Sequence, residues 1–179
     1  TLHGIQVQNG ILTLEGSHAD LNSADAKNVL VRRQEDFAFT AKVVMDCSAL
    51  QDGQDAGMTC YYDENTYLYC IHSRYFLQVF EKINMDEHVA FSKDITDAIM
   101  TQMSEIELQI TTDYLKRTFC YCCGKQETEP LGTLENVYYL CDEGIRKGKR
   151  FTGAMIGVYA YAAEECLKVN FRDFQYMSK

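Results

Sequence analysis

The chain has 179 residues, of which 46% are hydrophobic and 24% are charged. This composition is that of a globular protein long enough to bury one core, and too short for a barrel enzyme of about 250 residues. The formal net charge of −9 disfavours nucleic acid, because phosphate binding needs clustered Lys and Arg, and it gives no attraction to an anionic membrane.

Alternation of apolar and polar residues with a period of two dominates the chain and predicts β-strands. A shift in this alternation at Asp173 predicts a bulge in the last strand. Residues 86–103 are expected to hold a short helix or a loop, and the polar residues 124–130 a turn. The spacing of strands and turns predicts an all-β fold, a two-sheet antiparallel β-sandwich. In chain order, the expected strands are 37–45, 57–62, 67–72, 76–81, 105–110, 114–123, 154–161 and 167–171.

The start of the chain carries no initiating Met and does not resemble a signal peptide. No apolar run approaches the roughly 18 residues of a transmembrane helix. We interpret residues 1–179 as a single domain, either a processed product or a piece of a longer protein.

Most of the eight cysteines lie in apolar or aromatic runs, as buried free thiols do. We therefore predict reduced thiols and a cytoplasmic location in preference to a disulfide framework. The cluster of Cys120, Cys122 and Cys123 is a candidate zinc site, but the sequence has no second pair of ligands. Packing of these cysteines in a core is the preferred interpretation. The cysteines are Cys47, Cys60, Cys70, Cys120, Cys122, Cys123, Cys141 and Cys166.

A basic, glycine-flanked loop covers residues 144–150. Four positive charges in five positions could bind phosphate, but no phosphate-cradling GxxxxGK[ST] context surrounds them. We interpret this segment as a solvated loop.

Four stretches carry motifs that occur in a fixed order. They are GILTLEG with NVLVRRQ and FAFTA in residues 10–41, DAGMTCYYDEN in 55–65, FTGAMIGV in 151–158 and FRDFQY in 171–176. In this order they resemble the C-terminal β-sandwich of family 43 glycoside hydrolases, the β-xylosidase and α-L-arabinofuranosidase group. The resemblance covers nearly the whole chain and implies a concanavalin A-like jelly roll.

The resemblance also implies what this chain does not carry. In the family the sandwich follows a five-bladed propeller that holds the catalytic carboxylates, so the propeller is the expected partner and no catalytic residue is expected here. Glycoside hydrolysis needs two carboxyl groups across a sugar pocket. Glu105 and Glu107 share a strand face, but their alternation with Ile106 and Leu108 is typical of a solvated sheet face.

Two further expectations come from the resemblance. A loop before the AG motif projects an aromatic side chain toward the propeller in the family, and the matching Asp52, Gly53 and Gln54 contain none. Either another residue closes the pocket or this member leaves it more open. A structural calcium near the last strand would use Asn170, although Arg172 opposes a cation there; no other cofactor is expected.

The densest aromatic patch consists of Tyr61, Tyr62, Tyr67 and Tyr69. These rings are candidate carbohydrate contacts, and the alternative is aromatic packing between paired strands. The absence of tryptophan weakens a lectin-like role.

Three functions stay open at this point. The preferred one is a non-catalytic accessory β-sandwich of a family 43-type β-xylosidase or arabinofuranosidase, packing on a propeller and shaping its xylo-oligosaccharide pocket. The second is a stand-alone carbohydrate-binding module, and the third is an interaction domain without affinity for sugar. The reading frame upstream of Thr1 would separate them.

Overall fold

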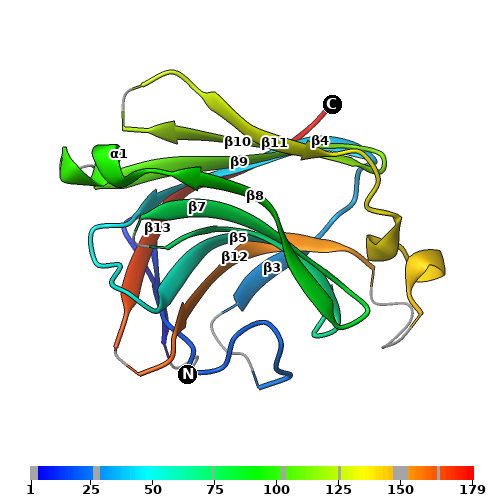
Figure 1. The fold of residues 1–179 in the computed structure, drawn as a ribbon, viewed down its shortest axis with the longest axis horizontal. Coiled ribbons are helices and arrows are strands. Elements are labelled where there is room, and N and C mark those ends of the chain that lie inside the picture. Colours follow the sequence, from blue (N-terminus) through cyan, green and yellow to red (C-terminus); the bar gives the residue numbers. More distant parts are fainter. Residues whose placement is uncertain are drawn as a thin grey trace.

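The computed structural model describes residues 4–25, 29–73, 75–101, 104–124, 126–146, 153–164 and 166–179. These residues form two antiparallel β-sheets packed face to face (Figure 1), so the predicted two-sheet sandwich is confirmed. The seven-stranded sheet has the order β1 (Ile5–Gln8), β2 (Ile11–Glu15), β13 (Lys168–Ser178), β4 (Ala38–Asp46), β9 (Glu105–Asp113), β10 (Lys116–Cys123) and β11 (Glu129–Leu134). The six-stranded sheet has the order β3 (Val29–Arg33), β12 (Met155–Ala162), β5 (Gln54–Asp63), β6 (Thr66–His72), β7 (Phe76–Ile83) and β8 (Asp86–Asp94).

The core lies between the sheets and follows from the period-two pattern. In β4 every second side chain points inward, and Phe39, Val43 and Met45 have no exposed surface. Met58 and Leu68 face them from the six-stranded sheet and are equally buried. Burial of each such side chain stabilises the fold by roughly 1.5–3 kcal/mol, which is why these segments adopt strands with one dry face.

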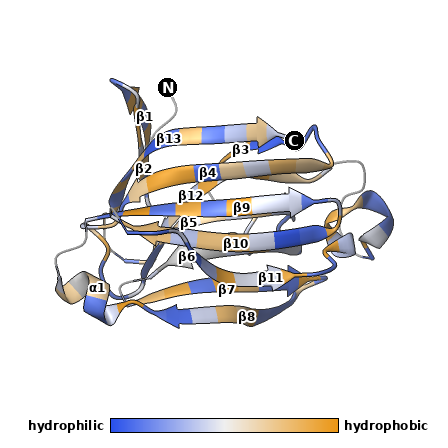
Figure 2. Ribbon diagram, turned by 90° about the horizontal axis from the view of Figure 1, so that it is seen from above, coloured by the Kyte–Doolittle hydropathy of each residue, from blue (hydrophilic) through white to orange (hydrophobic). Residues whose placement is uncertain are grey.

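The sandwich has two ends, which we name after their helices (Figure 2). The α1 end carries α1 (Thr96–Met100) and the connection from β4 to β5; the η end carries the short helices η1 (Tyr138–Leu140) and η2 (Asp142–Gly144). The first described residue lies at the α1 end, where the Gly4 carbonyl accepts a hydrogen bond from the Glu15 amide at 2.8 Å. The last lies at the η end, where the Lys179 amide donates to the Ala38 carbonyl at 3.1 Å.

Two predicted segments differ from the structure. Residues 86–103 contain the short helix α1, as one of the two expectations had it, but also the strand β8. The predicted turn at 124–130 is wrong at its end, because β11 begins at Glu129 and includes Pro130. β8 and β11 are edge strands, where exposed side chains on both faces and a proline are tolerated. The short strands β1, β2 and β3 were also not among the strands expected from alternation. The bulge predicted at Asp173 is confirmed: the pairing of β13 with β4 shifts between Arg172 and Gln175, and Asp173 has a φ of 54°.

The basic loop and the third motif fall partly outside the described residues, which leave out 147–152. Of the loop, Gly144 is the last residue of η2 (Asp142–Gly144) and Arg146 is exposed. No phosphate site is built on this segment here.

The cysteines differ in exposure, and none of those whose side chains are described forms a disulfide. Cys47, Cys60 and Cys123 are buried, Cys120, Cys122 and Cys141 are half-buried, and Cys166 is exposed. Within β10 the cluster alternates as expected, with Cys123 turned into the core. No group of three or more His, Cys, Asp or Glu side chains suited to a metal occurs in the described ranges.

Brief treatment of the native protein with a thiol reagent is expected to label Cys166 at least about a hundredfold faster than Cys47, because only an accessible thiolate reacts. Burial raises the pKa of Cys47 to about 12 and also raises the pKa of the enclosed Cys60. Peptide mapping by mass spectrometry before and after unfolding in urea would measure this difference. Equal labelling of Cys47 and Cys166 in the native state would contradict the buried positions.

Candidate functional site

The predicted rim loop (Asp52, Gly53 and Gln54) lies at the α1 end, where the chain crosses from one sheet to the other. Asp52 and Gly53 are exposed, and Gly53 has a φ of 78° that favours glycine. Gln54 is buried and begins β5, and its side-chain oxygen accepts a hydrogen bond from the Gln51 amide at 3.1 Å. This bond holds the loop closed, with its tip in solvent. A role of the rim loop toward a propeller stays a prediction.

The structure brings together three of the four predicted tyrosines. Tyr61, Tyr67 and Tyr69 lie on the outer face of the six-stranded sheet, in a second apolar cluster where Tyr67 is buried and Tyr61 and Tyr69 are half-buried. The ring centroids of Tyr61 and Tyr67 are 6.1 Å apart, and those of Tyr67 and Tyr69 are 5.4 Å apart. Tyr62 points the other way, has no exposed surface, and donates a hydrogen bond to Asp142. Side chains alternate along a strand, so Tyr62 belongs to the core.

Tyrosines from β12 complete the cluster, which we call the tyrosine face (Tyr61, Tyr67, Tyr69, Tyr159 and Tyr161). Tyr159 meets Tyr69 edge-on with ring centroids 5.8 Å apart, and Tyr69 stacks on Phe80 of β7 at 4.8 Å. The alternation in residues 154–161 put Tyr159 and Tyr161 on one side of their strand, but not beside the other three. Cross-strand aromatic packing, the alternative raised by the sequence, is therefore present on this face.

A polar network borders the tyrosine face. The Tyr67 hydroxyl lies 3.0 Å from both Asn22 Oδ1 and Glu87 Oε2. Burial, and then the charge of Glu87, raise the pKa values of Tyr67 and Tyr69. The Lys82 ammonium lies 5.3 Å from the Tyr67 ring centroid and donates to Asn22 and to the Glu64 carbonyl. Both hydroxyls therefore stay protonated at neutral pH, and the Tyr67 hydroxyl fixes the loop at Asn22 over the sheet.

Asp55 is a site residue that sequence reasoning missed. It follows the rim loop directly, opposes Tyr161 in the sheet, and lines a cavity of about 50 Å³ together with Asp20, Tyr69 and Tyr159. No hydrogen bond to its carboxylate is found among the described residues, and burial raises its pKa to about 6. A carboxylate with a raised pKa in a recess lined by tyrosines is typical of a binding surface. Its signals in the sequence were its position beside Gln54 and its place at the start of the DAGMTCYYDEN motif.

The surroundings of Asn170 do not fit a calcium ion. The Asn170 side-chain oxygen accepts a hydrogen bond from the Thr13 hydroxyl at 2.7 Å. Arg172, two residues on, is paired with Glu105 at 2.7 Å and with Asp173. Calcium takes six to eight oxygen ligands, and here the nearby acids neutralise a guanidinium instead. Calcium at Asn170 stays an untested prediction, and no step below depends on it.

The two glutamates considered as a catalytic pair are engaged in ion pairs. Glu105 pairs with Arg172, and Glu107 lies 3.3 Å from the Lys42 ammonium. Both side chains are partly exposed on the outer face of the seven-stranded sheet. This is the solvated sheet face that their alternation predicts.

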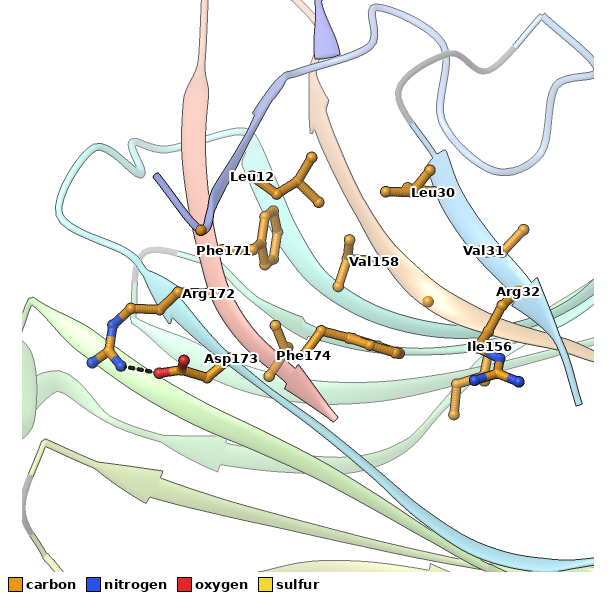
Figure 3. A pocket seen from close by; sticks show the side chains of 13 residues that line it. Leu12, Leu30, Val31, Arg32, Ile156, Val158, Phe171, Arg172, Asp173 and Phe174 are labelled. Atoms are coloured by element: carbon orange, nitrogen blue, oxygen red, sulfur yellow. Dashed lines mark hydrogen bonds and ion pairs between the residues drawn. The ribbon is translucent and has the colours of Figure 1, made fainter. Parts of the chain in front are cut away.

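An apolar groove of about 400 Å³ opens between β2 and β13 on one side and β3 and β12 on the other (Figure 3). Leu30 and Phe174 line it and are 44% and 40% exposed. Phe174 follows the bulge at Asp173, which changes the side of the strand that it faces. The deeper wall comes from Leu12, Val158 and Phe171. Sugar sites need several placed polar groups, and this groove has few.

Comparison with known proteins gives consistent results. The family model described as the β-xylosidase C-terminal concanavalin A-like domain matches residues 1–177. A putative β-xylosidase of Escherichia coli strain K12 is 24% identical over 99% of this chain and 33% of its own length. A β-xylosidase of Bacillus subtilis strain 168 is 24% identical over 90% of the chain and 31% of its own length. The chain thus spans about a third of these relatives.

Solved structures show the same fold. The family 43 protein BlXynB of Bacillus licheniformis superposes with a TM-score of 0.86 at 28% identity, covering 96% of this chain and 34% of that one. A xylan β-1,4-xylosidase of Bacillus halodurans C-125 superposes with a TM-score of 0.83 at 20% identity, again over 96% of this chain and 33% of that one. Among the described helices, none is long and apolar enough to cross a membrane.

Proposed function

The chain belongs to the family of C-terminal concanavalin A-like domains of β-xylosidases, and on this premise we propose that it is the accessory β-sandwich of a family 43-type β-xylosidase or arabinofuranosidase. In this proposal it carries no catalytic residue. It packs on a catalytic five-bladed propeller of the same polypeptide and shapes the pocket in which a xylo-oligosaccharide binds.

The observation that carries the proposal is the continuity of the rim loop with the recess at Asp55. Gln54 and Asp55 are adjacent at the start of β5, and Asp55 reaches Tyr161 and Tyr69 on the tyrosine face. One surface at the α1 end therefore combines an exposed loop tip, a carboxylate acceptor and the half-buried rings of Tyr69 and Tyr161, with Tyr67 and Tyr159 buried beside them. Sugar hydroxyls donate to carboxylates, and sugar rings pack on aromatic faces, so this surface suits the wall of an oligosaccharide pocket.

The rim loop of this chain lacks the aromatic residue that its family projects, which favours a more open pocket. Asp52 is exposed and has no left-handed backbone, so a larger side chain can be introduced there without strain. The cytoplasmic location stays a prediction beside this proposal, as free thiols are typical of reducing compartments.

In the full-length polypeptide, Asp52→Phe is expected to narrow the pocket and to change the KM for xylotriose by roughly threefold to tenfold relative to xylobiose, the range of one aromatic contact. Steady-state kinetics on the two substrates would measure this ratio. The matched control is Asp86→Phe, at the exposed first residue of β8, at the η end. Equal ratios in both variants and the wild type would contradict a pocket shaped by the rim loop.

A further inference from the structure

The sandwich is closed along one side and open along the other. On the closed side β8 and β11 touch, because a Cβ added to Gly132 would lie 2.5 Å from the Phe91 ring. The rings of Phe91 and Phe119 also have centroids 6.5 Å apart there. On the open side the two sheets end at β1 and β3, and the apolar groove of about 400 Å³ opens beside these strands (Figure 3). The inner faces of both sheets therefore reach solvent along the open side.

Three exposed apolar side chains belong to these inner faces. Val7 opposes Leu12 across the β1–β2 pair, and Leu12 lines the groove, so Val7 lies on the inner face of its sheet. Val7 is nevertheless 71% exposed. Leu30 likewise opposes Val158, which is buried, and Phe174 lines the groove after the bulge. Strand β1 therefore extends the seven-stranded sheet beyond the cover of the six-stranded sheet.

Among the described edge strands, β1 lacks the features that prevent an edge from pairing. β3 and β8 carry charged side chains, β11 carries Pro130, and the registers of β8 and β11 shift within their pairings. The sequence of β1, IQVQ, has no charge and no proline, and its pairing with β2 is regular. Edges without such features pair with further strands. A strand can therefore be added at β1.

The charges on the open side favour a second copy of this chain as the partner. A twofold axis brings each surface against itself, so a surface that binds itself must carry little unpaired charge. The net charge of −9 makes the chain as a whole repel a second copy. The charged groups that line the groove are paired within the chain, Arg32 with Glu35 at 2.9 Å, and Arg172 with Glu105 at 2.7 Å and with Asp173. The open side is thus a nearly neutral surface of an acidic protein.

We propose that two copies of this chain associate along the open side, with β1 of one copy pairing antiparallel with β1 of the other. The twofold axis stands perpendicular to the sheet, so the two seven-stranded sheets become continuous and both inner faces stay on one side. Val7, Leu30 and Phe174 of the two copies then cover both grooves. The proposal does not rest on the proposed function, because neither a sugar nor a propeller takes part in it.

Val7→Lys tests the pairing, because it places an ammonium group from each copy in the apolar contact beside the twofold axis. We expect sedimentation equilibrium between about 1 and 100 µM to show a dimer of the wild type, and a Kd that Val7→Lys raises at least about tenfold. Leu30→Asp, which charges the wall of the groove, is expected to raise the Kd by a similar factor. The matched control is Val89→Lys, at a 47% exposed valine of the edge strand β8 on the closed side.

Amide hydrogen exchange locates the contact. The amides of β1 are expected to exchange more slowly as the protein concentration rises through the Kd, whereas those of β8 keep their rates. Urea unfolding curves of the variants check that each is folded under these conditions. A chain that stays monomeric at about 100 µM, a dimer that Val7→Lys leaves intact, or equal dissociation by Val89→Lys would each overturn the proposal.

The same measurements on the full-length polypeptide separate the second copy from the other occupant of the open side. A dimer that dissociates with Val7→Lys supports the second copy. A monomer with slowly exchanging β1 amides would mean that the polypeptide preceding Gly4 covers this side, and would overturn the second copy. The rim-loop kinetics depend on the α1 end and not on β1, so the accessory role and the dimer can each fail without the other.

Discussion

Replacing Asp55 with Asn is expected to stabilise the protein at neutral pH and to flatten its stability between about pH 4 and pH 6. Burial raises the pKa of Asp55 from 3.8 to about 6 in the folded state. Between these values the folded protein holds a proton that the unfolded chain has lost, so the free energy of unfolding falls as the pH rises. Each pKa unit corresponds to 1.36 kcal/mol. At pH values above 6, the free energy of unfolding is therefore lower by about 3 kcal/mol than it is below pH 4.

Urea unfolding of the wild type and of Asp55→Asn at several pH values would measure this effect. The neutral amide keeps the shape of the side chain and carries no charge to desolvate, so its curve lacks that fall. The exposed Asp86→Asn serves as the control, with no expected change of this size. Parallel pH profiles for wild type and Asp55→Asn would contradict a buried, destabilising carboxylate. A carboxylate kept at such a cost to stability is typical of a binding surface.

Gly157→Ala is expected to destabilise the protein by about 3 kcal/mol or more, because it separates two strand backbones. A Cβ at Gly157 would lie 1.9 Å from the Leu30 carbonyl oxygen and 2.7 Å from the Val31 Cα. Both atoms belong to the backbone of β3, which pairs with β12 at this point. The strand can only move away, which breaks its hydrogen bonds and widens the apolar groove of Figure 3.

Urea unfolding measures the loss, and amide hydrogen exchange in β3 locates it. Gly10→Ala is the matched control: Gly10 has a φ of 79° but no atom within 4 Å of an added Cβ. That change is expected to cost only about 1 kcal/mol, the price of a left-handed conformation. If the two variants lose the same stability, close approach of β3 is not the reason for glycine at position 157.

The strands that could be predicted are those with one dry face. In β4, Phe39, Val43 and Met45 point inward and alternate with half-buried residues on the outer face, because the core lies on one side only. β8 was not predicted, since this edge strand is largely exposed on both faces and its three apolar residues, Val89, Ala90 and Phe91, are consecutive and do not alternate with polar ones. Pro130 favoured a turn in the sequence, but it lies in β11, because an edge strand need not donate every backbone amide to a neighbouring strand.

The candidate site could be predicted only in part. Alternation along a strand places Tyr67 and Tyr69 on one face. The same alternation places Tyr61 and Tyr62 on opposite faces, although a grouping by aromatic density puts them in one patch. Asp55 and Tyr161 meet only because β5 pairs with β12.

The entry point of the chain has a consequence for tethering. Gly4 bonds to Glu15, and the adjoining Gly16 lies against Ala162, which opposes Gln54 in the sheet. A polypeptide preceding Gly4 therefore joins the sandwich beside the rim loop, and a short tether there gives an effective concentration in the millimolar range. Even a weak interface between that polypeptide and the α1 end would then stay formed. Additions after Lys179 leave at the far end and would not compete with it.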